Sequence, residues 1–126
     1  MNQRLKDRIA LITGASRGIG RAVAVRFAQE GAHVLLLARR LKALEAVDDA
    51  IKAAGGKATL IPLDLTDGKA IDALGPSLYE RFGRLDVLVG NAAILGGLSP
   101  LPHIKSEHWE RVFAINATAN WRLIRT

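Results

Sequence analysis

The chain has 126 residues, of which 49% are hydrophobic and 24% charged, and it contains no cysteine. This composition fits one domain with a hydrophobic core, and it excludes disorder, a disulfide framework and thiolate chemistry. The formal net charge is +6, but the basic residues are dispersed and only 5% of residues are aromatic, which argues against a platform for single-stranded nucleic acid. We find no apolar run of membrane-spanning length and no signal peptide, and we expect a cytoplasmic protein without a membrane, nucleic-acid or metal partner.

Residues 9–20 have the sequence Ile-Ala-Leu-Ile-Thr-Gly-Ala-Ser-Arg-Gly-Ile-Gly. The four apolar residues at its start predict a strand that is buried on both faces, followed by a glycine-rich turn. A helix is expected next, with one apolar face formed by Ile19, Ala22, Val23 and Phe27. A strand, a glycine turn and a helix start can hold a pyrophosphate, because the helix N-terminus offers unpaired N–H groups and a partial positive charge.

The remaining chain alternates between strand and helix patterns. Strands are expected at 33–38, 58–63 and 85–90, and helices at 41–54, from 66 or 67 to 82, and from Ser106 onward. Gly75-Pro76 predicts a kink in the third helix or its division into two short pieces. In the last helix we expect an inward face made by Trp109, Val112, Phe113 and Ala117. This alternation predicts βαβ units and a parallel sheet.

The motif Thr-Gly-x-x-x-Gly-x-Gly at 13–20 resembles that of the short-chain dehydrogenase/reductase family at every fixed position. Taken alone, the same residues could form a turn that merely connects a strand to a helix. The resemblance implies an α/β fold with a Rossmann-type doubly wound parallel sheet, strand order 3-2-1-4 and a single domain over 1–126 that stops before a fifth strand. It also implies cofactor contacts in the turn, from Gly14, Ser16, Arg17, Gly18, Ile19 and Gly20.

Arg39 follows the second expected strand, where enzymes that use the unphosphorylated cofactor commonly carry Asp or Glu for the ribose hydroxyls. A guanidinium can instead bind a 2′-phosphate through forked hydrogen bonds. Arg17 adds a second positive charge, so we expect NADP(H) to be preferred over NAD(H). The alternative is that Arg39 and Arg40 are ordinary exposed bases at a helix start.

Two further segments match the family at the ends of later strands. Asp64 and Leu65 correspond to a pair that flanks the adenine, although Asp64 could equally cap the following turn. The family usually has Asn-Asn-Ala-Gly after the fourth strand, whereas this chain has Gly90, Asn91, Ala92 and Ala93. We expect the Asn91 amide to tie strand ends together, and the small residues beside it to leave room for ribose and nicotinamide.

The resemblance implies that Asn116 helps to hold a water molecule in a proton relay, while its place on the apolar stripe also fits a buried structural amide. The family's Ser and Tyr-x-x-x-Lys are not in this chain, whose one tyrosine, Tyr79, has Gly83 four residues later. We therefore expect this chain to be a fragment of an oxidoreductase that moves a hydride between NADP(H) and a carbonyl or alcohol substrate. The fragment alone is expected to be inactive.

Two other roles are open. The first is a half-fold that binds dinucleotide without catalysing a reaction. The second is a role in assembly, because a fourth strand without a neighbour has an unpaired edge that another chain could cover. In the family the last helix contributes to a subunit interface, and we expect a homo-oligomer through this helix, with Trp109 and Trp121 as anchors.

Overall fold

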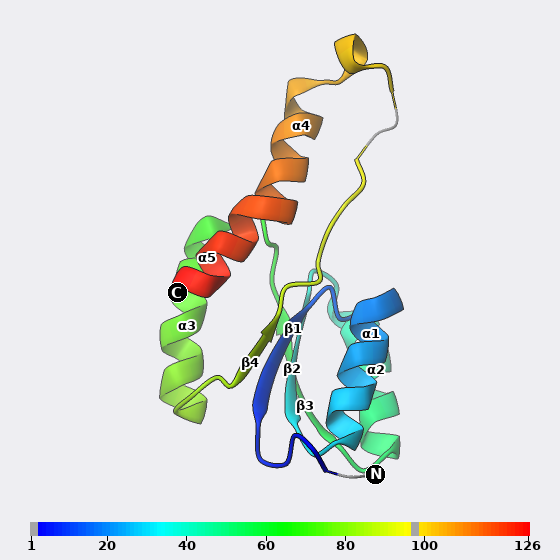
Figure 1. Ribbon diagram of the computed structural model, residues 1–126, viewed down its shortest axis with the longest axis vertical. Helices are drawn as coiled ribbons and strands as arrows, with labels where there is room; N and C mark the ends of the chain where they lie inside the picture. Colours follow the sequence, from blue (N-terminus) through cyan, green and yellow to red (C-terminus); the bar gives the residue numbers. More distant parts are fainter. Residues whose placement is uncertain (1–2, 97–98) are drawn as a thin grey trace.

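The computed structural model describes residues 3–96 and 99–126, and it contains a parallel sheet with helices on both faces (Figure 1). The strands are β1 (Ile9–Thr13), β2 (His33–Ala38), β3 (Lys57–Pro62) and β4 (Val87–Val89). Their order is β3-β2-β1-β4, and every neighbouring pair is parallel. The predicted sheet and its strand order are confirmed, although β3 begins and ends one residue earlier than expected and β4 is only three residues long.

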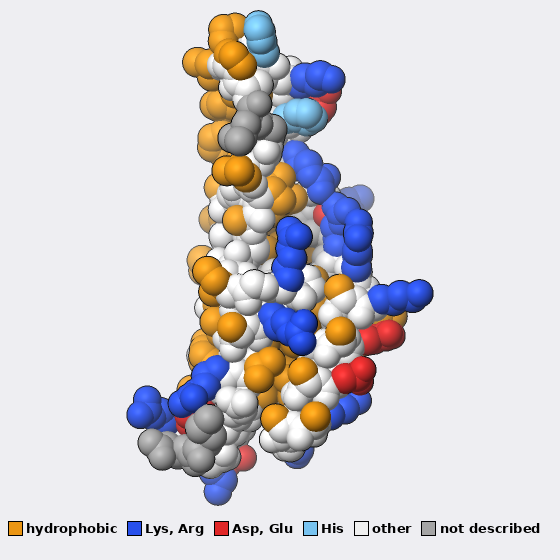
Figure 2. Space-filling view, turned by 90° about the vertical axis from the view of Figure 1, so that its right-hand side faces the viewer, with side chains coloured by type: hydrophobic (Ala, Val, Ile, Leu, Met, Phe, Trp, Pro, Cys, Tyr) orange, Lys and Arg blue, Asp and Glu red, His pale blue; other side chains and the backbone are white. Residues whose placement is uncertain are grey.

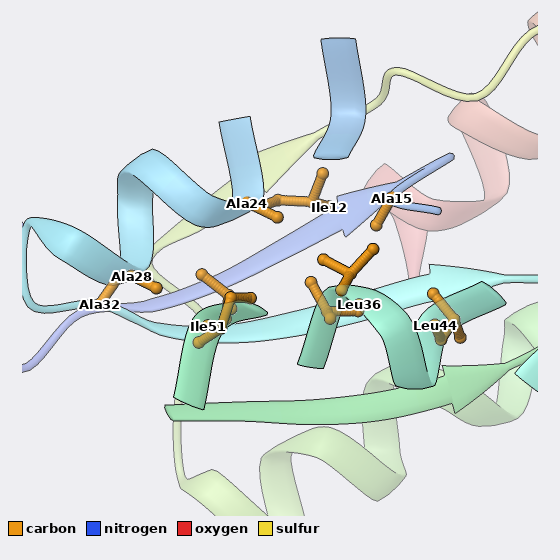
Figure 3. Close-up of a cluster of buried hydrophobic side chains, with 10 residues drawn as sticks. Ile12, Ala15, Ala24, Ala28, Ala32, Leu36, Leu44 and Ile51 are labelled. Atoms are coloured by element: carbon orange, nitrogen blue, oxygen red, sulfur yellow. The ribbon is translucent and has the colours of Figure 1, made fainter. Parts of the chain in front are cut away.

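Alternate residues of β2 pack into two separate hydrophobic clusters. Val34 and Leu36 face α1 (Gly18–Gln29) and α2 (Leu41–Ala53), where they meet the cluster drawn in Figure 3. Leu35 and Leu37 face α3 (Gly68–Phe82) and α5 (Ala119–Arg125) on the other side of the sheet. Because β2 is buried on both faces, its sequence is an unbroken apolar run rather than an alternating one.

The face that α1 buries is not the one predicted. Gly20, Ala24 and Ala28 are its buried residues, whereas Ile19 is 75% exposed. Small residues spaced four apart let the helix backbone lie close to the sheet, while Val23 and Phe27 are only partly buried at the edge of the cluster. The prediction failed because the apolar side-chain pattern gives no weight to close packing through glycine and alanine.

The third helix is one continuous element, so the expected division into two pieces is wrong. Pro76 lies inside α3 and has no N–H to donate to the carbonyl of Asp72. That carbonyl instead accepts a hydrogen bond of 2.9 Å from Thr126 Oγ1. A Cβ on Gly75 would lie 2.7 Å from the same hydroxyl oxygen. The missing side chain of Gly75 therefore lets Thr126, directly after α5, pack against α3.

The last helical region consists of α4 (Ser106–Phe113), a π-helical segment at 114–118 and α5. Figure 1 shows α4 extending beyond the sheet, with a short 3-10 turn at Leu101–His103 at its outer end. Trp109 and Phe113 are 52% and 51% exposed, so the predicted inward face of this helix is wrong. Burial comes further along, at Ile115, Ala119 and Leu123, where the helix reaches α3 and the sheet.

Capping residues define the ends of α3 but not the start of α4. Asp67 caps α3 by accepting a hydrogen bond from Ala70 N, and Gly83 ends this helix with a φ of 78°. Ser106 is the first residue of α4 rather than its cap, which is Lys105 without a side-chain hydrogen bond. In the described part of the chain, no helix has the length and apolar character needed to cross a bilayer.

The Asp86 carboxylate fixes the start of β1 beside β4. Its Oδ2 accepts hydrogen bonds from Ile9 N at 2.8 Å and from Arg84 Nε at 2.9 Å. The Asp86 N–H also donates to the Ile9 carbonyl at 2.9 Å. The hydrogen bond from Ile9, together with those of Arg84 and the nearby Arg8 charge, holds the pKa of Asp86 below its ordinary value of 3.8.

We predict that this carboxylate makes the fold sensitive to acid. Since its pKa is lowered in the folded state, the stabilisation is present above pH 3.8 and is lost as pH falls through the lower folded-state pKa. Asp86→Asn should therefore lower Tm at pH 7, and the difference from wild type should shrink toward pH 3. Thermal unfolding at both pH values tests this, and an equal difference at the two would contradict it.

Candidate functional site

The predicted site residues come together along one edge of the sheet. The glycine turn follows β1, Arg39 follows β2, Asp64 follows β3 and Asn91 follows β4. All four strands are parallel, so these segments lie at the same carboxyl edge, where ligands bind in open α/β sheets. The topology therefore brings the predicted residues together at one edge of the sheet.

The turn after β1 depends on glycine for two different reasons. Gly14 and Gly18 have φ angles of 61° and 58°, which residues with a side chain adopt only at a cost. Gly20 has no such angle, but a Cβ there would overlap the Gly14 carbonyl oxygen and lie 2.6 Å from Asn91 Nδ2. A Cβ on Gly18 would meet no atom within 4 Å, so this side of the turn is open to an approaching group.

The N-terminus of α1 presents unpaired donors at this edge. The first hydrogen bond of the helix runs from Arg21 N to Arg17 O, which leaves the preceding helical N–H groups without an intrahelical partner. Arg17 supplies no side-chain cap, and no acidic residue lies in the first turn. Ser16 lies half-buried beside it. This arrangement is suited to an anion that accepts hydrogen bonds from backbone amides.

A network around Thr13 joins the ends of β1 and β4. The buried Thr13 Oγ1 accepts hydrogen bonds from the N–H groups of Asn91 and Ala92, both at 3.0 Å, and lies 3.4 Å from Val89 O. Asn91 Nδ2 in turn donates to the carbonyls of Thr13 and Gly14, each at 3.3 Å. The expectation that Asn91 ties strand ends together is confirmed.

Thr13 itself was not among the predicted site residues, although it stands first in the glycine motif. A polar residue at the end of a run of buried apolar residues was the available signal, since a buried hydroxyl needs partners. Its partners lie 78 and 79 positions away in the chain, and local patterns do not reveal them.

Asp64 caps the turn that follows it, which was one of its two expected roles. Its Oδ1 accepts hydrogen bonds from Thr66 N at 2.9 Å and from Thr66 Oγ1 at 2.8 Å. These two bonds, with smaller effects from the charges of Arg39 and Arg111, lower the pKa of Asp64. Asp64 Oδ2 has no hydrogen-bond or ion-pair partner among the described residues, so it remains available as an acceptor. Leu65 is only 9% exposed and packs in the cluster under α3 and α5.

Positive charge gathers near this edge. Arg17, Arg39 and Arg40 are exposed, and none of them forms an ion pair within residues 3–96 and 99–126. Figure 2 shows Lys and Arg side chains collected on the face that α1 and α2 present, below the protruding end of α4. The donors and charges of this edge therefore fit an anionic ligand such as a phosphate ester.

Asn116 is exposed rather than buried, which corrects the interpretation of a core amide. Its side chain pairs with the backbone of Ile94, accepting from Ile94 N and donating to Ile94 O, both at 2.8 Å. This pairing fastens the loop after β4 to the π-helical segment at 114–118. Ala92 is half-buried and Ala93 exposed on the same loop, between the Asn91 and Asn116 contacts.

The geometry defines a class of protein, an open parallel α/β domain whose carboxyl edge is suited to an anion. Within the described residues, this edge has a helix N-terminus without a side-chain cap, two arginines without an ion pair after β1 and β2, and an Asp64 oxygen without a partner after β3. A pyrophosphate bears negative charge that the helix N-terminus favours, and the open side of Gly18 leaves space for it.

The family follows from comparison with known proteins. A family profile described as short chain dehydrogenase matches residues 8–126, and the chain belongs to this family. It is 39% identical over 113 residues to a 3beta-hydroxysteroid dehydrogenase of Mediterraneibacter gnavus, covering 90% of this chain and 41% of that protein. The chain thus spans less than half the length of this curated relative.

Solved structures agree with the fold and include both forms of the cofactor. A metagenomic short-chain oxidoreductase in complex with NADP has a TM-score of 0.93 and 40% identity, covering 96% of this chain and 55% of that one. Carveol dehydrogenase from Mycobacterium avium in complex with NAD has a TM-score of 0.87 and 29% identity, covering 97% of this chain and 48% of that one.

We predict that the Thr13 hydroxyl stabilises the fold through its two accepted hydrogen bonds. Thr13→Val keeps the shape but leaves the part-buried N–H groups of Asn91 and Ala92 without this acceptor, so it should cost about 1–3 kcal/mol. Thr13→Ser retains the hydroxyl and should lose less. Urea unfolding measures both, and a Thr13→Val protein within about 0.5 kcal/mol of wild type would contradict the role.

A second prediction concerns the close approach at Gly20. Gly20→Ala should destabilise the chain by about 1–3 kcal/mol, because the blocking atom is a backbone carbonyl that cannot move freely. Gly68→Ala is the control, since a Cβ there meets the Arg122 guanidinium at 2.8 Å, at the end of a flexible side chain. Equal losses of stability in the two variants, compared by urea unfolding, would refute the argument.

Proposed function

We propose that this chain is the cofactor-binding part of an oxidoreductase that moves a hydride between NADP(H) and a carbonyl or alcohol substrate. The observation that carries the proposal is the uncapped N-terminus of α1 beside the glycine turn, at the same edge as Arg17 and Arg39, which form no ion pair with any residue that the structure describes. When bound, the nicotinamide supplies or accepts the hydride, and the residues of this chain hold and orient the dinucleotide.

Each segment of the carboxyl edge has a part in this binding. The turn that contains Gly14, Ser16, Gly18 and Gly20 holds the pyrophosphate, with the exposed Ile19 side chain against the cofactor. Asp64 Oδ2 accepts a hydrogen bond from the adenine amino group, since Oδ1 is engaged by Thr66. The side chain of Leu65 is buried, so its contact with the adenine comes from its backbone.

The loop after β4 serves the nicotinamide end. The Asn91 side-chain nitrogen already donates to the carbonyls of Thr13 and Gly14. Asn91 therefore serves cofactor binding by fixing the position of this loop. Ala92 and Ala93 follow directly and carry only methyl groups, which leave space for ribose and nicotinamide. The network thus holds the nicotinamide side of the site at a fixed distance from the pyrophosphate turn.

The preference for NADP(H) rests on Arg17 and Arg39. A 2′-phosphate carries a charge that an exposed guanidinium binds with two parallel hydrogen bonds, whereas a carboxylate at the end of β2 would repel it. The complex of the metagenomic oxidoreductase with NADP supports the phosphorylated form, and that of carveol dehydrogenase with NAD shows that relatives differ.

Asn116 would hold water for the proton relay through its main chain. Both polar atoms of its side chain are hydrogen-bonded to the backbone of Ile94. Its main-chain carbonyl accepts a hydrogen bond from Asn120 Nδ2 at 3.2 Å. A carbonyl has two lone pairs, and we propose that this one, in the π-helical segment, is where the water molecule binds. Since the chain has no Tyr-x-x-x-Lys, we propose that these 126 residues bind cofactor without turnover.

Assembly is the second candidate role, and two exposed surfaces favour it. The Trp109 and Phe113 rings lie against each other on α4 at an angle of 41°, with centroids 5.0 Å apart, and about half of each residue is exposed. An open groove of about 750 Å³ runs between β4, α3 and α5, with Leu78, Leu88 and Leu123 in its lining. We propose homo-oligomer formation through α4, which light scattering showing a stable monomer would refute.

Cofactor selectivity tests the proposed function directly. Arg39→Asp should weaken NADPH binding by about tenfold or more, as expected for the loss of charged hydrogen bonds, and change NADH binding far less. Arg40→Asp, at the neighbouring exposed position, is the matched control. Calorimetric titration of the purified chain gives both affinities, and equal losses for NADPH and NADH in Arg39→Asp would overturn the assignment of the 2′-phosphate.

A further inference from the structure

The side chain of Asn120, on α5, lies against the first residue after β4. A Cβ built on Gly90 would be 2.7 Å from Asn120 Oδ1, 3.3 Å from Asn120 Cγ and 3.7 Å from Asn120 Nδ2. The half-buried Asn120 amide therefore occupies the space that a side chain at position 90 would need.

Gly90 is needed here for space and not for its backbone conformation. It is not one of the described glycines with a positive φ, in contrast to Gly14 and Gly18. A residue with a side chain could adopt this backbone conformation, and the nearest obstacle to that side chain is the Asn120 amide. The glycine thus allows a close approach between the end of β4 and α5.

The same amide is tied to the residue that holds the other end of this loop. Asn120 Nδ2 donates to Asn116 O at 3.2 Å, and the Asn116 side chain exchanges two hydrogen bonds of 2.8 Å with the backbone of Ile94. Two asparagines four residues apart therefore contact the loop near its start, at Gly90, and at Ile94.

We propose that Asn120 is a positioning residue for dinucleotide binding, which holds the start of the loop after β4 against α5. The inference rests on the proposed function, in which this loop serves the nicotinamide end of the cofactor. Thr13 fastens the loop to the glycine turn, whereas Asn116 and Asn120 fasten it to the last helical region. The residues that leave space for ribose and nicotinamide are thus held from two sides.

The experiment compares two ligands that share the adenine half of the cofactor. NADPH contains the nicotinamide ribose, whereas adenosine 2′,5′-bisphosphate has the adenine and the 2′-phosphate without it. Asn120→Leu has a side chain of similar size without an amide. It should weaken NADPH binding roughly two- to tenfold, as expected for the loss of one positioning hydrogen bond, and leave bisphosphate binding unchanged.

Thr118→Ala is the matched control in the same helical region. Thr118 is exposed, and its side chain provides no cap hydrogen bond to α5, so both affinities should stay at the wild-type values. Asn120→Ala repeats the comparison without the bulk of leucine. Calorimetric titration of the purified chain gives the affinities, and circular dichroism verifies the fold of each variant.

A double-mutant cycle tests the contact itself. Gly90→Ala should lower the urea midpoint of unfolding, because the added Cβ displaces the Asn120 amide from Asn116 O. In the Asn120→Ala background the space is empty, so the same change should lower the midpoint less. An equal drop in the two backgrounds would overturn the contact and the inference with it.

The outcomes separate this inference from the function on which it rests. Equal weakening of NADPH and the bisphosphate in Asn120→Leu would overturn the inference, because the residue would then support the fold alone. Unchanged affinity for both ligands would also overturn it. In either case, a wild-type chain that binds NADPH and a selective Arg39→Asp variant leave the proposed function standing. A wild-type chain that binds neither ligand would overturn both.

Discussion

The contact between the ends of β1 and β4 is the constraint on which the rest of the site depends. Thr13 Oγ1 binds two backbone N–H groups of the β4 loop, and the Asn91 amide binds two carbonyls of the glycine turn. The loop after β4 donates all four bonds to Thr13 and Gly14, and together they fasten this loop to the end of β1 and its turn. Gly20 is required at the same point because its missing side chain lets Gly14 and Asn91 meet. A phosphate site made of backbone amides needs such a rigid frame.

Much of the fold followed from local patterns in the sequence. The apolar run His33–Ala38 is a doubly buried strand, and the strand order 3-2-1-4 came from the family resemblance and from right-handed crossovers. The ends of elements were less predictable, because β4 has only three residues where six were expected. Of the two outcomes predicted at Gly75-Pro76, a kink or two short pieces, the division is wrong for a tertiary reason, because Thr126 Oγ1 donates to the carbonyl that proline leaves unpaired.

The site was predictable where it depends on residue type and less so where it depends on contacts across the chain. Glycines with positive φ, an arginine after β2 and an asparagine after β4 are visible in sequence. The engagement of Asn116 by Ile94 arises only when the loop after β4 and the π-helical segment come together in the folded chain. The apolar face of α4 was assigned inward because periodicity identifies an apolar face without identifying what covers it.

The central claim is that the carboxyl edge of this sheet binds a dinucleotide through the turn after β1. Amide resonances of the 15N-labelled chain, followed by NMR during addition of NADPH, test it most directly. We predict saturable shifts that concentrate at residues 14–20 and at Arg39, Asp64 and Asn91, with the amides at the opposite edge, near Asp86 and Gly83, unchanged. Shifts absent from residues 14–20, or spread evenly over the basic surface, would contradict the account.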